Sequence, residues 1–235
     1  MKRKEIENII QKQMASPEEI TDLQNADLSG MDLSGLVFHR LNMNDVNLAN
    51  CDLSQCTFVD CDMRYANLKF AKLENTNFSE TYLTYANMSW TNMKNCEFEN
   101  CDLNECDFTR ANLIGVKFED SALTYAKFLY ANLTNSSLEK TSLRYANLQN
   151  TCLVNVELMN TNLPEGFYQI NTFYECITYN KLENTIIYNP WKNQNNTLEE
   201  FRKYVQQKYG KESEDHDETI YKELMNAIAY FQILK

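Results

Sequence analysis

The sequence predicts an all-β solenoid in which each coil has four similar sides. Two observations carry this prediction. Every fifth position from Leu23 to Leu163 is Leu, Phe or Met, without exception. Neither an α-helix nor a single strand has a period of five, so the pattern is an internal repeat. A second period of 20 residues relates Tyr65 to Tyr85 and Tyr125 to Tyr145, so four five-residue units are expected to close one coil.

A second set of regularly spaced positions, which hold small residues, forms the inward face together with the large residues. From Val46 to Thr161, the position two residues before each large residue holds only Ala, Cys, Ser, Thr or Val. Alternate residues of an extended chain point to the same side. The small and the large residue of each unit are therefore expected to face inward, while the other three turn the chain and face water.

The units resemble those of the pentapeptide-repeat family, whose motif is Ala-(Asp/Asn)-Leu-x-x. Ala66-Asn67-Leu68 and Ala131-Asn132-Leu133 match it directly, and the resemblance covers about residues 21–175. It implies a right-handed quadrilateral β-helix. The residue pattern itself predicts the four-sided coil, and the hand comes from the resemblance.

The segment before the repeats, residues 1–20, is predicted to be a short helical cap. Ile6, Ile9, Ile10 and Met14 have helical spacing, and Ser16-Pro17-Glu18-Glu19 is typical of a helix start. A solenoid end exposes its core, so a capping element with a polar outer side is expected there.

After Leu163 the repeat loosens. Pro164 and Gly166 interrupt it, and Leu182 and Ile187 predict a degenerate last coil, so the predicted β-helix spans residues 21–190. Residues 191–235 are predicted to hold a linker and two amphipathic helices, at 197–209, ended by Gly210, and at about 218–233. Because amphipathic helices must cover their apolar faces, these should dock on the end of the solenoid, on its side, or on another subunit.

The charge of the chain is acidic and unevenly distributed. The net charge is −11, and residues 21–175 hold twenty acidic against ten basic residues. This balance argues against direct binding of nucleic acid or of an anionic membrane. The sequence shows neither the apolar run of a signal peptide nor a transmembrane stretch, which predicts a cytoplasmic location.

Most of the eight cysteines belong to the small inward register: Cys51, Cys56, Cys61, Cys96, Cys101 and Cys106. No two of these six are one coil apart, and none has Cys-x-x-Cys spacing, so buried free thiols are predicted rather than disulfides or metal ligands. His39 and His216 lie in different segments, and the carboxylates lie on convex faces. The sequence therefore predicts no cofactor, no metal site, no catalytic residues and no enzyme.

Two outward surfaces are candidates for function. Aromatic residues occupy two neighbouring corners, with Glu105 and Arg110 as gaps, and exposed aromatic residues mark contact surfaces. Alternatively, the rings only stack on one another or lie under the C-terminal helices. The candidate interaction surface is Tyr65, Phe70, Tyr85, Trp90, Tyr125, Tyr130 and Tyr145. A candidate acidic face, which is either a solvated face or a surface for a basic partner, is Asp60, Glu80, Glu97, Glu99, Glu119, Asp120 and Glu139.

The predicted function is that of a non-enzymatic interaction scaffold, with an unidentified protein or a second copy of the chain as its partner. The family resemblance implies an alternative, because quinolone-resistance pentapeptide-repeat proteins are acidic dimeric rods that resemble DNA and act on DNA gyrase, a type II topoisomerase. The solenoid carries one net charge per ~3.5 Å, however, about half the density of duplex DNA. Such relatives dimerise through the C-terminal end of the solenoid, and helices follow that end here. Both observations favour the scaffold.

Overall fold

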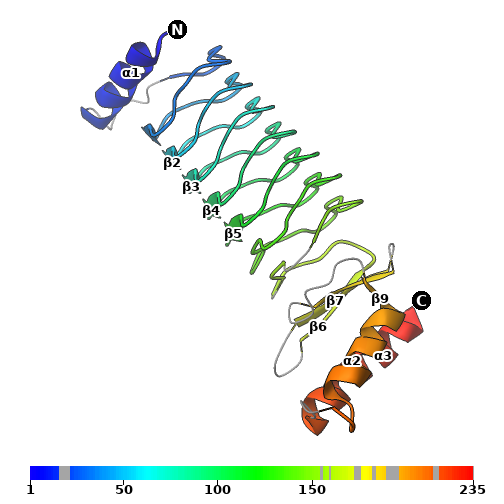
Figure 1. Cartoon of the computed structure of the whole chain (residues 1–235). Coiled ribbons are helices and arrows are strands. Elements are labelled where there is room, and N and C mark those ends of the chain that lie inside the picture. Colours follow the sequence, from blue (N-terminus) through cyan, green and yellow to red (C-terminus); the bar gives the residue numbers. More distant parts are fainter. Residues whose placement is uncertain are drawn as a thin grey trace.

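The computed structural model describes residues 1–15, 22–153, 156–158, 160–171, 176–181, 184–188, 196–213 and 217–234. The chain forms a rod of stacked coils (Figure 1). Helix α1 (Arg3–Ala15) lies at one end of the rod, and helices α2 (Leu198–Tyr209) and α3 (Glu218–Leu234) lie at the other. The predicted solenoid with one N-terminal and two C-terminal helices is confirmed.

Parallel pairing between residues 20 apart builds the coils. It runs without a change of register from the bridge between Asp22 and Asn42 to that between Ser142 and Asn162. On one face the pairing is regular enough to form a five-stranded parallel sheet in the order β1-β2-β3-β4-β5. Its strands are β1 (Val37–His39), β2 (Thr57–Val59), β3 (Asn77–Ser79), β4 (Glu97–Glu99) and β5 (Lys117–Glu119).

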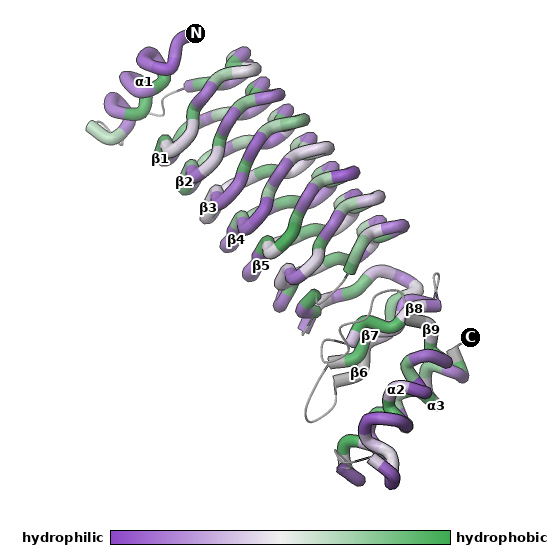
Figure 2. The backbone as a smooth tube through the Cα atoms, in the orientation of Figure 1, coloured by the Kyte–Doolittle hydropathy of each residue, from purple (hydrophilic) through white to green (hydrophobic). Residues whose placement is uncertain are grey.

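Both inward registers are buried, as the sequence predicts. Large residues such as Leu68 and Phe98 and small ones such as Ala66 are at most 1% exposed. The tube in Figure 2 therefore alternates between hydrophobic and hydrophilic residues along each coil. Behind the sheet, the rings of Phe38, Phe58, Phe78, Phe98 and Phe118 form one stack, with centroids 4.7–5.0 Å apart.

The corners have left-handed backbone. The residue that turns each corner has a positive φ even where it is bulky, for example 64° at Tyr85 and 61° at Trp90. At most corners an amide donates back across the turn, as from Ala66 N to Met63 O at 3.1 Å. A non-glycine residue in this region costs about 1–2 kcal/mol, and Asn tolerates it best. Bulky aromatic residues at corners therefore need compensating contacts.

Helix α1 covers the first coils. Its Ile6 and Ile10 are buried in the same core as the coil residues. The Arg3 guanidinium donates to the backbone oxygens of Asp32 (3.1 Å) and Ser34 (2.9 Å), which ties the helix to the first coil. Met14, predicted on the apolar face, is exposed. The predicted helix start at Ser16 lies outside the described residues.

The region after Leu163 differs from the predicted degenerate coil. Residues 167–197 contain antiparallel strands in the order β6-β7-β8-β9, namely β6 (Phe167–Asn171), β7 (Cys176–Asn180), β8 (Thr185–Tyr188) and β9 (Asn196–Thr197). The physical reason is a change of period. Ile177 and Tyr179, and likewise Ile186 and Tyr188, alternate with a period of two, which is the pattern of a strand in a flat sheet.

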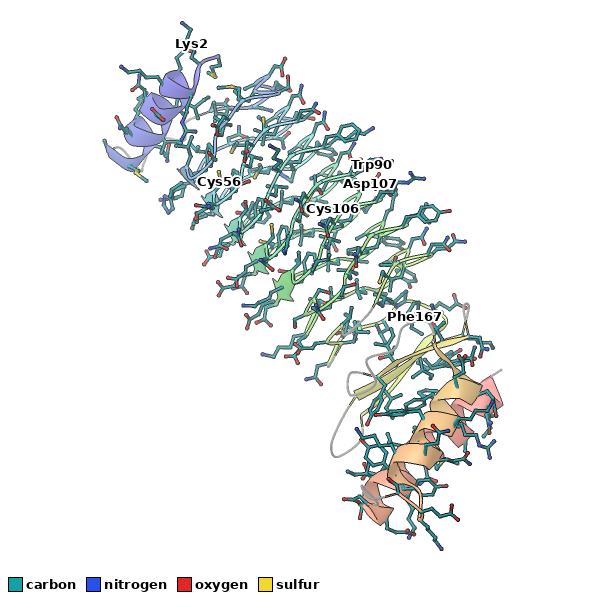
Figure 3. All side chains as sticks on the ribbon, in the orientation of Figure 1. Lys2, Cys56, Trp90, Cys106, Asp107 and Phe167 are labelled. Carbon is teal, nitrogen blue, oxygen red and sulfur yellow. The ribbon has the colours of Figure 1, made fainter. Side chains whose placement is uncertain are left out.

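This antiparallel sheet lies between the solenoid and the helix pair. Ile177, Tyr179, Ile186 and Tyr188 form a second core with α2 and α3, centred on Phe201 and Phe231. Phe167 and Ile187 pack instead against the solenoid core, and Figure 3 shows Phe167 where the rod meets the sheet. Helix α2 starts with a complete capping box between Thr197 and Glu200 and ends at Gly210.

Deleting residues 197–235 is expected to cause aggregation. The truncation removes both helices and exposes Ile177, Tyr179, Ile186 and Tyr188, each at most 5% exposed in the full chain. An uncovered apolar sheet favours intermolecular pairing. Size-exclusion chromatography with light scattering measures the effect. A truncated protein that stays monodisperse, with the same number of subunits as the full chain, would contradict the expectation.

Candidate interaction surface

The four corners of the rod carry different kinds of residue, and we name two of them. The tyrosine column is Tyr65, Tyr85, Glu105, Tyr125 and Tyr145. The tryptophan column, on the next corner, is Phe70, Trp90, Arg110 and Tyr130. The side of the rod formed by these two columns and by the residues between them, 66–69 and their equivalents 20 residues apart, is here called the aromatic face. The third corner carries mainly Asn and Gly, and the fourth carries charged residues such as Asp60 and Lys140.

The tyrosine column consists of two stacked pairs. The rings of Tyr65 and Tyr85 are parallel within 3° with centroids 5.1 Å apart, and those of Tyr125 and Tyr145 are 4.8 Å apart. Between the pairs, the Tyr85 hydroxyl donates to Glu105 Oε1 at 2.7 Å. This hydrogen bond to a carboxylate raises the pKa of Tyr85. Each ring is about half exposed, so the C-terminal helices do not cover the column.

The tryptophan column is continuous because a cation fills its gap. Arg110 Cζ lies 4.6 Å from the Trp90 ring centroid and 5.3 Å from that of Tyr130. Below Trp90, the Phe70 ring is tilted at a centroid distance of 6.1 Å, with Lys69 Nζ 5.1 Å from its centre. Figure 3 shows Trp90 at the edge of the rod, with Asp107 next to it in the view.

All seven predicted aromatic residues thus lie on one side of the rod, each between 46% and 54% exposed. Over residues 65–70, 85–90, 105–110, 125–130 and 145–150, this surface carries the basic residues Lys69, Arg110 and Lys127 and the acidic residues Glu105 and Asp107. It is therefore close to neutral, although the chain as a whole is strongly acidic.

The acidic face lies on the opposite side, on and around β4 and β5. Glu99 and Glu119 are neighbours in the parallel register, so two carboxylates stack directly. Two of the seven acidic residues form exposed ion pairs, Asp60 with Arg40 at 3.4 Å and Glu97 with Lys117 at 2.7 Å. The hydrogen bond to Glu97 also raises the pKa of Lys117. Within the described residues the other five carboxylates form no ion pair, so cations interrupt the face at two of its seven positions.

The described residues include thiols and side chains of the types that bind metal ions. No group of three or more His, Cys, Asp or Glu among them could hold a metal ion. The six inward cysteines are buried and unbridged, as predicted, and burial raises the pKa of the Cys96 thiol to about 12. Such a thiol stays protonated and is a poor nucleophile. None of the helices in the described part of the chain is long and apolar enough to cross a membrane.

Sequence reasoning located the rings but not their partners. It treated Glu105 and Arg110 as gaps, whereas the structure makes them a hydrogen-bond acceptor and a cation between two rings. The sequence contains a pattern that indicates the Arg110 contact, because the 20-residue period places Arg110 directly between Trp90 and Tyr130. Tyr82, about half exposed on the face next to the tyrosine column, was also not included in the candidate surface.

The coils, their corners and the outward columns define a class of protein, the four-sided β-solenoid built from five-residue units. Family models match almost the whole solenoid: pentapeptide repeats (8 copies) at residues 21–60 and 61–100, and a pentapeptide repeat region at residues 91–167. The chain belongs to the pentapeptide-repeat family. None of the curated protein sequences matches it.

Solved structures of several pentapeptide-repeat proteins are similar to parts of the chain. HetL of the cyanobacterium Nostoc, described as involved in heterocyst differentiation regulation, is 18% identical, with a TM-score of 0.35 over 62% of this chain and 90% of HetL. Full-length QnrB1, a plasmid-mediated fluoroquinolone resistance protein, is 16% identical, with a TM-score of 0.44 over 59% of this chain and 84% of QnrB1. Rfr23 of the cyanobacterium Cyanothece is 18% identical, with a TM-score of 0.29 over 67% of this chain and 95% of Rfr23.

Proposed function

We propose that this chain is a non-catalytic scaffold that binds a protein partner through its aromatic face. The observation that carries the proposal is the gathering of seven half-exposed rings on two adjacent corners of one near-neutral face. Large exposed aromatic residues concentrate at protein interfaces and dominate their binding energy. The seven unbridged cysteines of the described part suit a reducing compartment, which supports a cytoplasmic location.

The geometry of the rings favours a protein over a nucleic acid. In the stacked pairs each ring covers a face of its neighbour, so bases have few free ring faces on which to stack. What remains exposed are ring edges and hydroxyl groups, which combine apolar area with hydrogen-bonding capacity. Left-handed corners also make these rings costly for folding. Stacking contributes about 0.5–1.5 kcal/mol per pair of rings, which offsets the backbone strain at these corners. Asn would carry less strain at the same corners, so stacking alone does not explain why seven of them hold aromatic residues.

Trp90→Asn is expected to weaken partner capture or self-association by about tenfold or more, because truncating a central aromatic residue costs about 2 kcal/mol at an interface. Asn is the suitable replacement because it occupies many corners of this solenoid, such as Asn95 and Asn135, with the same positive φ. The variant should fold normally. Lys140→Asn, at the charged corner, is the matched control and should bind like the original protein.

Three measurements on each variant test the proposal. Sedimentation velocity over a range of concentrations reports association of a second copy, and retention on immobilised protein reports capture of another partner. Thermal melting reports stability. If Trp90→Asn lowers Tm but binds as the unaltered chain does, the rings serve only internal stacking and the proposal fails.

A DNA-mimicking modulator of a type II topoisomerase is the second candidate. The observation that favours it is the acidic ladder Glu99, Glu119 and Glu139 on the opposite face. A DNA gyrase supercoiling assay, with and without a fluoroquinolone, tests it. In that case Glu99→Gln with Glu119→Gln should abolish the effect while Trp90→Asn leaves it intact. For partner capture the scaffold proposal predicts the opposite: Trp90→Asn should weaken it, and Glu99→Gln with Glu119→Gln should leave it intact.

A further inference from the structure

The tyrosine column contains a gap one ring wide. Within the described part of the chain, Tyr85 stacks only on the side of Tyr65, and Tyr125 only on the side of Tyr145. Their other faces point toward the intervening coil, which carries Glu105 at this corner. Coils are spaced by one strand separation, so the two rings are roughly 10 Å apart. That distance holds one planar group in contact with both rings.

The neighbouring column shows what fits such a gap. There Arg110 occupies the position equivalent to Glu105, and its guanidinium lies between Trp90 and Tyr130 at 4.6 and 5.3 Å from the ring centroids. A guanidinium is planar and cationic, and it is attracted to the negative faces of two aromatic rings at once. Among the residues that the structure describes, the rod therefore has one gap that a cation fills and an equivalent gap in which no cation lies.

The gap of the tyrosine column has the opposite charge. Glu105 is exposed, and its Oε1 accepts the Tyr85 hydroxyl, which holds the carboxylate beside the gap. A carboxylate has further acceptor positions for an incoming donor. Two arginines near the column are held elsewhere: Arg64 forms two hydrogen bonds with Asp62, and Arg144 lies 4.9 Å from the centre of the outer ring, Tyr145.

We propose that Tyr85, Glu105 and Tyr125 form a slot that binds the guanidinium of an arginine side chain from the partner protein. The two ring faces supply cation–π contacts, and the Glu105 carboxylate supplies charge-assisted hydrogen bonds to the guanidinium edge. The inference rests on the proposed function, because the partner supplies the side chain, and it adds the chemistry of the group that is recognised. An ammonium lacks the plane that contacts both rings, so arginine is preferred over lysine.

The probe for the slot is N-acetyl-arginine amide, titrated into the full-length protein and followed by NMR. Saturating shifts are expected in the ring protons of Tyr85 and Tyr125 and in the Glu105 amide, with a millimolar Kd because the slot is exposed. N-acetyl-citrulline amide has the same shape without the charge and should bind at least about tenfold more weakly, a difference of about 1.4 kcal/mol. N-acetyl-lysine amide should also bind more weakly than arginine.

Exchanging the two gap residues gives a reciprocal test. Glu105→Arg should fill the slot as Arg110 fills its own gap and abolish binding of the probe, and the corner tolerates it because Glu105 and Arg110 have nearly the same φ, 58° and 60°. Arg110→Glu should create a second slot, with new shifts at Trp90 and Tyr130. Glu105→Gln keeps an acceptor for Tyr85 and should weaken binding several-fold if the charge matters.

The inference is overturned if arginine amide does not bind, if citrulline or lysine amide binds equally well, or if Glu105→Arg leaves the shifts unchanged. These outcomes are independent of the scaffold proposal. Loss of partner capture in Trp90→Asn, together with no arginine binding, would keep the aromatic face as an interface and reject the slot alone.

Discussion

Replacing Phe98 with aspartate is expected to abolish soluble folding. Phe98 is 1% exposed and lies in the middle of the phenylalanine stack, 4.8 Å from Phe78 and 5.0 Å from Phe118. Losing the ring costs about 3–5 kcal/mol, and placing a carboxyl group between two rings adds several more. The sum is comparable with the whole stability of a typical domain, about 5–15 kcal/mol.

The matched control is Phe98→Leu. Leucine fills the same inward register on the other faces, for example at Leu68 and Leu103, and an apolar exchange that leaves only a small cavity costs about 1–2 kcal/mol. This variant should stay soluble with a slightly lower Tm. Circular dichroism and size-exclusion chromatography compare the two. Soluble Phe98→Asp with the native spectrum would contradict the inward assignment of the register.

The solenoid could be predicted from sequence because its burial depends on the period alone. Once Leu68 faces inward, every residue five positions away has the same environment, so one local pattern fixes most of the core. The C-terminal helices were predicted to within about a residue for a different reason. Their ends are encoded locally, by the capping box of Thr197 and Glu200 and by Gly210.

The antiparallel sheet could not be predicted in the same way. Residues such as Ile187 and Leu182 fit a five-residue period loosely and a two-residue period equally well, and short apolar runs do not distinguish them. Tertiary contacts decide whether this segment forms a coil or a flat sheet. Strand β8 packs Ile186 and Tyr188 into the core with α2 and α3, while Ile187 packs on its other side against the solenoid core. A coil presents only one face inward and could not cover both cores.

For the candidate surface, the sequence predicts which side chains share a column but not which contacts they make with one another. The 20-residue period places Tyr85, Glu105 and Tyr125 in one column, and the structure has them there. The period does not specify the rotamer of a glutamate at that position. The rotamer decides whether the side chain points away, pairs with a hydroxyl or covers a ring. The left-handed corners were equally hidden, because glycine is scarce and Tyr or Trp would not suggest a positive φ.

Alkaline pH is expected to destabilise the protein strongly through its buried thiols. Burial raises the pKa of Cys56 and Cys61 to about 11 and that of Cys96 and Cys101 to about 12. In the unfolded chain a thiol titrates near 8.5. The folded state therefore binds more protons than the unfolded state between these values. Stability is fully present below about pH 8.5 and falls as the pH rises toward 11 or 12.

The expected effect is large because several thiols act together. Each unit of pH above the unfolded pKa costs about 1.4 kcal/mol per thiol, so near pH 10.5 each buried cysteine lowers the free energy of unfolding by roughly 2–3 kcal/mol. Four such cysteines approach the total stability of a domain. Other side chains also respond to alkaline pH, so the thiol contribution must be isolated by comparison with a variant.

The chain itself provides the matched substitutions. One coil before Cys96, Thr76 occupies the same column and donates from Oγ1 to Leu53 O at 2.8 Å, just as Cys96 donates from Sγ to Leu73 O at 2.6 Å. Thr81 stands in the same relation to Cys101, with bonds to Phe58 O and Phe78 O. Cys96→Thr with Cys101→Thr therefore keeps the hydrogen bonds and removes two groups that titrate.

Urea unfolding at pH 7.5 and at about pH 10.5 separates the contributions. The double variant should match the original protein within about 1 kcal/mol at pH 7.5 and exceed it by roughly 4–6 kcal/mol at the higher pH, since two thiols no longer titrate. In parallel, a thiol reagent at neutral pH should label the partly exposed Cys152 first and the six inward cysteines only in denaturant. Equal loss of stability in both proteins, or rapid native labelling of Cys101, would show that these thiols are not held in the solenoid core.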